Sequence, residues 1–373
     1  MEPTVLAYFA DDSTRTYQLV QWLPVLELLD SAQPVAVVLR DQRSAEVVRE
    51  RTRLPVLVAP AFSELTGLYA ALGPKVVLYC NNSVLNVQSL LHAGMLHVHI
   101  NHGESDKQSM ASNNAKAYDR VFVAGEAAVQ RYAAELLELD TGKLVRIGRP
   151  QLDLSPPELL APSERRTVLY APTWEGDADY NDYTSVDTLG VDIVRGILSV
   201  PDVRLVYKPH PKVVTSETPA IRDAHRAILA MVASAGPEHR AITFGDILGV
   251  LPACDAIVTD VSSVGLDWLY LRTECPIFIT DRHHDAERLR RDVPVSRCAD
   301  VLDDVDPTAV AALVATRLDH DEHHLARVAM RHHYFDDVAV GESTTRFIEA
   351  VGGLVALRDR LVGADVPGAA ITA

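Results

Sequence analysis

Short apolar runs alternate with longer amphipathic segments along most of the chain. The first part of the sequence contains six runs with the length and composition of buried strands: TVLAYF, PVAVVL, LPVLVA, KVVLYC, LHVHIN and RVFVAG. Between them lie segments with apolar residues at helical spacing, such as YQLVQWLPVLELL and EAAVQRYAAELLEL. This alternation predicts a parallel sheet with helices on both of its faces.

The alternation pauses at residues 146–166, which are rich in proline and charge and which we interpret as a linker. A second series follows, with the runs TVLYAP, VRLVYKP, AITFG, DAIVTD and CPIFIT. We therefore predict an α/β protein with two doubly wound, Rossmann-like domains facing a cleft, at residues 1–150 and 165–340. Residues 341–373 are expected to form a helix that packs back across the domain boundary, followed by a frayed tail.

The bulk composition narrows the class of protein. A chain of 373 residues exceeds what one hydrophobic core comfortably organises, which agrees with two domains. Its formal net charge of −16 argues against broad nucleic-acid binding and against an electrostatic hold on anionic lipid, because both need a basic face. An anionic substrate would therefore need a local cationic pocket.

Cysteine usage and the N-terminal segment indicate the compartment. The four cysteines are scattered and form no C-x-x-C pair, as in proteins of a reducing compartment. The segment MEPTVLAYFADDST lacks the basic region and apolar stretch of a signal peptide, and no apolar run approaches the roughly 20 residues of a membrane helix. We expect a cytoplasmic protein, and peripheral contact with the inner face of the membrane remains open.

Polar clusters follow several of the apolar runs. The first is HVHINHGESDK, residues 97–107. Alternation places His97 and His99 on one face of a strand, where we interpret them as side chains satisfied inside the sheet. His102 lies in the turn beside Gly103, which lets a ligand approach the backbone closely, so we predict that His102 acts as a general base.

Two further clusters mark strand ends in the second series. In VLYAPTWEGD, a strand runs into Thr173 and Trp174, which fits either a ligand-binding turn or a turn with a packed indole. In LVYKPHPK, Lys208, His210 and Lys212 are held between prolines that fix the backbone. Cations gathered at a strand end of an acidic protein indicate an anion site.

The fourth cluster is AIVTDVSSVGLDWLYL, residues 256–271. Ser262 and Ser263 stand where a helix is expected to begin, so they either cap the helix or help its N–H groups to hold an anion. Together with Lys208 and His210 they favour a site for a diphosphate. Asp267, one helical turn further on, is expected either to accept a hydroxyl of a ribose or polyol or to face solvent.

Other motifs that carry chemistry are absent from the sequence. It contains no G-x-x-x-x-G-K-[ST], no G-x-G-x-x-G after the first strand and no G-x-S-x-G. Three pairs of adjacent histidines lie in charged segments without the spacing of metal ligands. We therefore expect no metal site and no cofactor.

Four segments together resemble one known family. HG followed by a lysine, then YAPTW, KPHP and TDVSSVGLD, resemble the motifs of the CDP-glycerol glycerophosphotransferases, the teichoic-acid primases and polymerases. The resemblance covers roughly residues 95–350 and implies a GT-B-like fold. It implies an enzyme that moves a polyol phosphate from a CDP-linked donor to an acceptor hydroxyl during synthesis of a cell-wall or capsule-type glycopolymer, with CMP as the leaving group.

The resemblance also implies roles for individual residues. The catalytic pair maps to His102, as general base, and His210. The positions implied for binding the donor and its phosphates are Thr173, Lys208, Ser262, Ser263 and Asp267, with Gly341, Glu342 and Ser343 near the nucleotide. Gly103 and Lys107 are implied on the acceptor side, where a glycan, polyol or lipid-linked molecule would bind.

The sequence departs from the family pattern in two places. The family commonly reads HGTPLK where this chain reads HGESDK, and commonly has an arginine where this chain has Glu175. A GT-B glycosyltransferase that uses a nucleotide-sugar is therefore a second hypothesis, and a non-catalytic nucleotide-binding protein is a third. Release of CMP would favour the first hypothesis, release of a nucleoside diphosphate the second, and binding without turnover the third.

Overall fold

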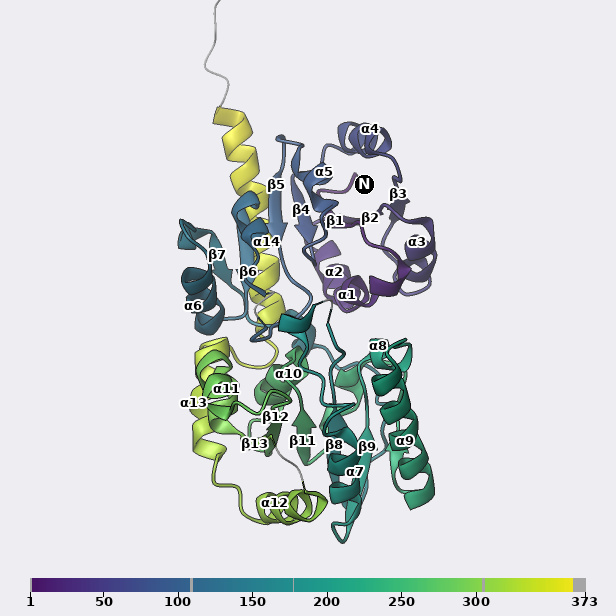
Figure 1. The fold of residues 1–373 in the computed structure, drawn as a ribbon. Helices are drawn as coiled ribbons and strands as arrows, with labels where there is room; N and C mark the ends of the chain where they lie inside the picture. Colours follow the sequence, from purple (N-terminus) through teal and green to yellow (C-terminus); the bar gives the residue numbers. More distant parts are fainter. Residues whose placement is uncertain (1, 108–109, 177, 304–305, 365–373) are drawn as a thin grey trace, which may run out of the picture. The chain divides into compact units, whose positions relative to one another are not determined.

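The structure of the protein is a computed structural model that describes residues 2–107, 110–176, 178–303 and 306–364 (Figure 1). The chain divides into two compact units. Unit 1 comprises Met1–Glu104, Ala111–Leu154 and Phe335–Ala373, and unit 2 comprises Ser105–Met110 and Ser155–Tyr334. The chain therefore passes repeatedly from one unit to the other.

Unit 1 contains a seven-stranded parallel sheet in the order β3-β2-β1-β4-β5-β6-β7. The strands are β1 (Val5–Phe9), β2 (Val35–Leu39), β3 (Val56–Val58), β4 (Val76–Tyr79), β5 (Leu96–His99), β6 (Arg120–Val123) and β7 (Leu144–Arg146). The helices are α1 (Tyr17–Val20), α2 (Leu23–Asp30), α3 (Gln42–Arg49), α4 (Phe62–Leu72), α5 (Asn86–Leu90), α6 (Glu126–Glu135) and α14 (Ser343–Ala364).

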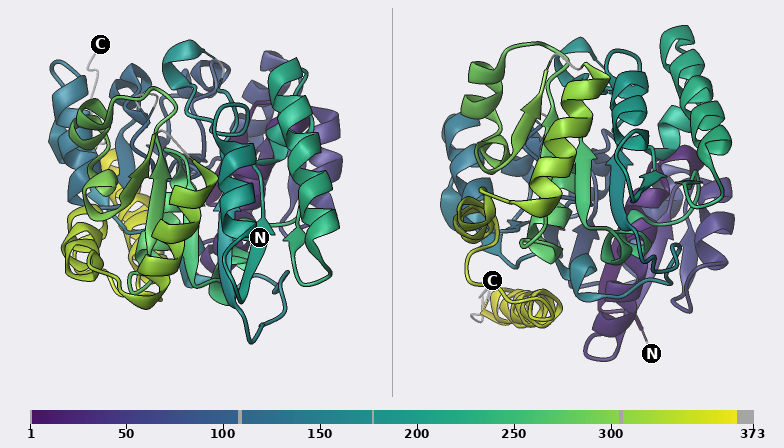
Figure 2. Two further views of the ribbon diagram at one scale, coloured as in Figure 1. Left: turned by 60° about the horizontal axis from the view of Figure 1, so that its bottom comes forward. Right: turned by 90° about the horizontal axis from the view of Figure 1, so that it is seen from below.

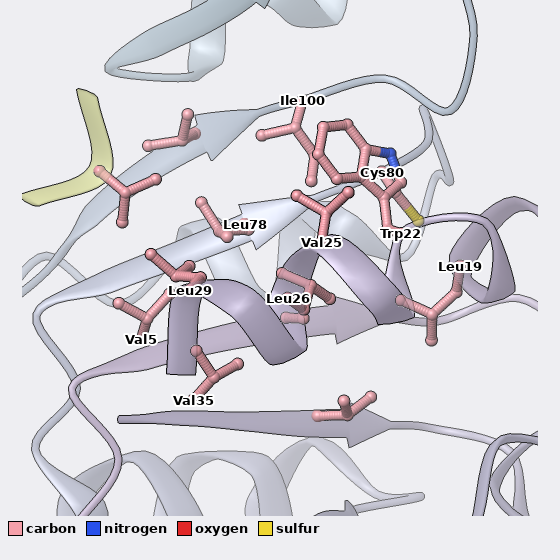
Figure 3. Close-up of a cluster of buried hydrophobic side chains, with 14 of the residues drawn as sticks. Val5, Leu19, Trp22, Val25, Leu26, Leu29, Val35, Leu78, Cys80 and Ile100 are labelled. Atoms are coloured by element: carbon pink, nitrogen blue, oxygen red, sulfur yellow. The ribbon is translucent and has the colours of Figure 1, made fainter. Parts of the chain in front are cut away.

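Helices cover both faces of this sheet, and successive residues of β1 alternate between them. Val5 joins the cluster around Trp22 (Figure 3), while Leu6 joins a second cluster with Tyr69 of α4. The two faces are buried because a doubly wound sheet sends its crossover helices to both sides. The central strands therefore read as continuous apolar runs in the sequence.

The C-terminal helix α14 belongs to unit 1. Phe347 and Val351 of this helix are fully buried in the cluster of Figure 3, and the ring centroids of Phe347 and Trp22 lie 5.2 Å apart. Such burial of aromatic surface fixes the helix onto the sheet. The predicted frayed tail falls on residues 363–373, of which 365–373 lie outside the described residues.

Unit 2 contains a six-stranded parallel sheet in the order β10-β9-β8-β11-β12-β13. The strands are β8 (Arg166–Ala171), β9 (Val203–Tyr207), β10 (Arg240–Ala241), β11 (Ala256–Thr259), β12 (Ile277–Thr280) and β13 (Asp300–Leu302). The helices are α7 (Gly190–Leu198), α8 (Pro211–Val214), α9 (Pro219–Ala235), α10 (Ser263–Leu271), α11 (Ala286–Asp292), α12 (Pro307–Asp319) and α13 (His324–Phe335). Helices α12, α7 and α9 lie in a row and pack against the same core cluster (Figure 2).

Two elements differ from the sequence-based expectation. The segment predicted as a linker contains the end of β7 and a short 3-10 helix, Pro150–Asp153. This helix belongs to unit 1, and its residues Pro150, Gln151 and Leu152 are buried. Strand β13 was also not predicted from the sequence. Both β7 and β13 are three-residue edge strands that are only partly buried, so neither contains the long apolar run that marks a central strand.

Candidate active site

Polar side chains gather at the carboxyl ends of four neighbouring strands in unit 2. Thr173 follows β8, Lys208 follows β9, Asp260 follows β11 and Asp281 follows β12. Because these strands are adjacent and parallel, in the order β9-β8-β11-β12, the four turns meet at one edge of the sheet. This edge is where ligands bind in doubly wound sheets.

Lys208 is a buried cation at this edge. The residue is only 4% exposed. Its ammonium makes no hydrogen bond or ion pair with any residue that the structure describes. Burial lowers the pKa of Lys208, while the charge of Asp246 raises it by a smaller amount. Burying an ammonium without a partner is unfavourable, so an anion bound at this edge would stabilise Lys208.

His210 presents a defined tautomer in the next turn. It is the N-cap residue of α8, and its Nδ1 accepts the backbone N–H of Lys212 at 3.2 Å. With Nδ1 acting as an acceptor, the proton of a neutral ring resides on Nε2, which therefore serves as a donor. The ring stacks on Trp174 with centroids 6.1 Å apart, and Lys212 Nζ lies 3.4 Å from the centroid of that indole.

The start of α10 contains the two predicted serines. Ser262 occupies the N-cap position, but its side chain makes no capping hydrogen bond and lies 3.3 Å from the hydroxyl of Thr259. Ser262 and Ser263 are both partly exposed. The first turn of α10 therefore keeps the N–H groups and the positive dipole end that suit an anion. Asp267 is only 4% exposed, so the expectation that it could face solvent is wrong.

Asp260 is the residue of this edge that sequence analysis did not assign. Its Oδ2 accepts the backbone N–H groups of Thr173 and Ser185 at 2.7 and 3.2 Å. Its Oδ1 accepts the hydroxyls of Ser185 and Thr280 at 2.5 and 2.6 Å. The residue is 1% exposed, and burial raises its pKa to about 6 although the four hydrogen bonds lower it.

The segment after Thr173 is held to the sheet by a second anchor. Arg282, which follows β12, donates from Nη1 to the carbonyl oxygen of Thr184 at 2.9 Å and to Asp182 Oδ1 at 2.8 Å. Asp187 Oδ1 lies 3.4 Å from the same nitrogen. The segment 182–187 is therefore fastened from two sides, by Arg282 and by Asp260.

The structure gives Glu175, which departs from the family pattern, an internal role. Its Oε1 accepts the hydroxyls of Ser216 and Thr218 at 2.6 and 3.2 Å, which ties the turn after β8 to the segment between α8 and α9. An arginine at this position could not accept these two hydrogen bonds. Where the family commonly has an arginine, Glu175 therefore binds two neighbouring hydroxyls of its own chain.

Lys107 lies in the short segment Ser105–Met110, which belongs to unit 2. Its Nζ is 3.4 Å from the hydroxyl of Thr173 and 5.7 Å from the ring centroid of Tyr183. Lys107 was predicted on the acceptor side, and the structure places it beside a residue predicted for the donor.

The acidic residues of HGESDK are engaged internally. Glu104 is 4% exposed and forms an ion pair with Arg131 of α6 at 2.5 Å, within unit 1. Asp106 accepts a hydrogen bond from the hydroxyl of Tyr334, whose oxygen also accepts the backbone N–H of Val295, within unit 2. These carboxylates therefore hold the segment in place on both sides of the point where the chain changes units.

His102 lies in unit 1, directly after Asn101, whose φ of 54° is left-handed. The Nη1 of Arg149 donates to the His102 carbonyl oxygen at 3.4 Å. The pKa of His102 is lowered to about 4, mainly by burial and also by the charge of Arg149, while a hydrogen bond with the Cys80 backbone opposes both effects. The imidazole is therefore neutral at pH 7, the state in which it can accept a proton.

His97 and His99 have partners inside unit 1. The ring of His97 lies 2.7 Å from the Tyr79 hydroxyl and 2.9 Å from the His92 carbonyl oxygen, and His99 Nε2 lies 2.8 Å from Asn101 Oδ1. Burial lowers the pKa of both rings. These contacts agree with the interpretation that both histidines are structural.

The three residues predicted near the nucleotide lie at the start of α14 in unit 1. Ser343 is fully buried and its hydroxyl accepts the backbone N–H of Arg149 at 3.0 Å. The backbone N–H of Gly341 donates to Asp153 Oδ1 at 2.7 Å. Glu342 Oε2 accepts the Ala339 N–H at 3.3 Å. These contacts fasten the returning chain to unit 1.

The structure thus brings one group of predicted residues together in unit 2: Thr173, Lys208, His210, Ser262 and Ser263, with Lys107 beside Thr173 and Asp267 in the helix that follows. The other predicted residues lie in unit 1: His102, Gly103, Gly341, Glu342 and Ser343. In the described ranges, no three His, Cys, Asp or Glu side chains form a group that could hold a metal ion.

Comparison with protein families decides the assignment. The model of the CDP-glycerol:poly(glycerophosphate) glycerophosphotransferase family matches residues 86–351, which is well over half of the chain. The chain belongs to this family. It is therefore a CDP-glycerol glycerophosphotransferase-like transferase. No curated protein sequence matches it significantly.

Solved structures agree with the fold of this glycerophosphotransferase family member. The wall teichoic acid polymerase TagF is 12% identical, with 96% of this chain and 90% of that chain covered and a TM-score of 0.60. The glycotransferase of kitacinnamycin is 14% identical, with 95% and 100% covered and a TM-score of 0.62. A structure named as a UDP-N-acetylglucosamine 2-epimerase, from Listeria monocytogenes, is 16% identical, with 100% of both chains covered and a TM-score of 0.61. Together with the two Rossmann-like sheets, these likenesses establish the predicted GT-B-like fold.

In the parts of the chain that the structure describes, no helix has both the length and the hydropathy to cross a bilayer.

Proposed function

We propose that this family member transfers a polyol phosphate, such as glycerol phosphate, from a CDP-linked donor to a hydroxyl of a glycan, polyol or lipid-linked acceptor. The observation that carries the proposal is the unpaired ammonium of the buried residue Lys208, at the same sheet edge as the uncapped start of α10. A diphosphate would supply the negative charge that both features lack.

In the proposed reaction, the acceptor oxygen attacks the phosphorus that bears the polyol. The new bond joins that oxygen to phosphorus, and the bond from phosphorus to the bridging oxygen breaks. CMP leaves with the electron pair, and the proton of the acceptor hydroxyl passes to a base. The products are the acceptor phosphodiester and CMP, so atoms and charge balance.

We assign the base to His102 because its ring is neutral at pH 7. A pKa of about 4 makes this ring a weak base in the free protein.

We assign His210 and Lys208 to the diphosphate. The Nε2–H of His210 would donate to a phosphate oxygen, since its Nδ1 is occupied by the Lys212 N–H. Lys208 would neutralise charge as CMP departs. Ser262, Ser263 and the first N–H groups of α10 would hold the remaining oxygens.

The proposed setting is the cytoplasm. All four cysteines are free and buried, as expected in a reducing compartment.

The test measures donor binding and product release together. The purified protein would be titrated calorimetrically with CDP-glycerol, CDP and UDP-sugars, and turnover would be followed by release of CMP. His210→Ala should abolish most turnover, while His324→Ala, an exposed histidine of the same unit, should be neutral. Preferential binding of a UDP-sugar, with release of UDP, would replace this proposal with a glycosyltransferase.

A further inference from the structure

One buried carboxylate connects three segments of unit 2 that are far apart in the sequence. Asp260, at the end of β11, binds the turn after β8 through Thr173, the 182–187 segment through Ser185, and the last residue of β12 through Thr280. Its partners lie 87, 75 and 20 residues away in the chain. None of these four hydrogen bonds involves a side chain that we propose to bind the donor.

We propose that Asp260 is a positioning residue of the donor site, which holds the Thr173 turn and the 182–187 segment in place around the start of α10. The proposal rests on the function proposed above and adds a residue that would act through others. Ser262 and Ser263 follow Asp260 within three positions of the chain. The carboxylate therefore couples the turn that carries the serines to the ends of both neighbouring strands.

The two oxygens of Asp260 have different kinds of partner. Oδ2 receives two backbone N–H groups, which can only donate. Oδ1 receives two hydroxyls, which can rotate and accept instead. An asparagine could therefore keep its carbonyl oxygen on the backbone side and donate its amide to the hydroxyls. An alanine would leave the Thr173 and Ser185 N–H groups buried without partners.

The loss of Asp260 should loosen this edge without unfolding the unit. Arg282 independently fastens the 182–187 segment through the Thr184 carbonyl and Asp182. The core between the sheet and α7, α9 and α12 is made of hydrophobic side chains, and the substitution leaves all of them in place. The effect of a substitution on the site can therefore be measured on a folded protein.

The same strand offers a matched control. Asp255 stands just before β11, and its Oδ2 accepts the backbone N–H of Thr167 at 2.7 Å, at the start of β8. Asp255→Ala thus also removes a carboxylate that joins the β8 and β11 segments, but at the amino-terminal edge of the sheet. It should lower the melting temperature and leave the donor KM unchanged.

The experiment compares Asp260→Ala, Asp260→Asn and Asp255→Ala in the full chain, with KM and kcat for CDP-glycerol and the melting temperature of each. Asp260→Ala should raise the donor KM about tenfold or more, because a shift of a positioned group of about 1 Å costs up to about a hundredfold. Asp260→Asn should stay within about threefold of the wild type. The proposal is overturned if Asp260→Ala keeps the wild-type KM or if Asp255→Ala raises it equally.

A second readout separates this proposal from the proposed function. Amide hydrogen exchange can follow the Thr173 N–H without any donor. The Thr173 amide should exchange slowly in the wild type and in Asp260→Asn, and rapidly in Asp260→Ala. If the protein never uses CDP-glycerol but this pattern holds, the proposed function fails while the positioning role stands. A Thr173 amide that stays protected in Asp260→Ala would refute the positioning role.

Discussion

Replacing Lys208 with methionine should make the protein more stable and less able to bind its donor. The methionine side chain is similar in length and apolar, so it can occupy the same space. Lys208 is 4% exposed, and its ammonium has no hydrogen-bond or ion-pair partner among the described residues. The substitution therefore removes a charge from a buried residue without breaking a hydrogen bond or ion pair of its side chain with the described residues.

The size of both effects follows from this environment. Removing a poorly compensated buried charge should stabilise the folded state by about 1–2 kcal/mol. In a domain of the size of unit 2 this raises the melting temperature by roughly 3–6 °C. Removing the cation from a bound diphosphate should cost about 3 kcal/mol of donor affinity, or roughly a hundredfold in Kd.

The dependence on pH has a definite sign. Burial lowers the pKa of Lys208 below its usual value of 10.5. Between the folded and unfolded values, the unfolded chain binds more protons, so the stability contributed by this group rises with pH. The gain in free energy of unfolding from Lys208→Met should therefore be largest at neutral pH and should shrink as the solution becomes alkaline.

Calorimetric unfolding and titration with CDP-glycerol and CDP test the reasoning. Lys212→Met is the matched control, since Lys212 has a partner in the Trp174 ring and is partly exposed. That variant should gain no stability. The proposal is that the Lys208 ammonium is unpaired in the free protein and binds the diphosphate of the donor. A Lys208→Met protein that is less stable, or that binds CDP-glycerol as tightly as the wild type, would refute it.

Three further substitutions test the structure elsewhere. Gly148 has a φ of 73°, and a Cβ there would lie 2.3 Å from the Ser343 hydroxyl, so Gly148→Ala should lose about 2 kcal/mol or more in urea unfolding. Glu104→Gln should cost about 2–3 kcal/mol in the same assay, because it leaves the Arg131 guanidinium without its carboxylate. Burial raises the pKa of Asp260 from 3.8 to about 6, so the native state holds its proton longer than the unfolded chain does. Between about pH 4 and pH 7, Asp260→Asn should therefore gain about 3 kcal/mol relative to the wild type, and equal pH profiles of the two proteins would contradict this.

Part of the candidate site could be predicted because its chemistry is local. In KPHP, two prolines fix a turn that carries Lys208 and His210 at the end of a buried strand, and the sequence contains both the strand and the cations. Ser262 and Ser263 mark a helix start in the same way. A prediction that these residues bind an anion needs no knowledge of a distant partner.

The sequence by itself determined the two parallel sheets, because their central strands are buried on both faces and so consist of unbroken apolar runs. It did not determine β7 and β13, since partly buried edge strands need no such run. Only the tertiary structure decided that Ser105–Met110 joins unit 2, and that Asp260 is a bound carboxylate rather than a helix-start residue. The physical reason is the same for the Ser105–Met110 segment and for Asp260. Their partners lie many residues away in the chain, and a hydrogen bond between distant segments leaves no periodic trace in the sequence.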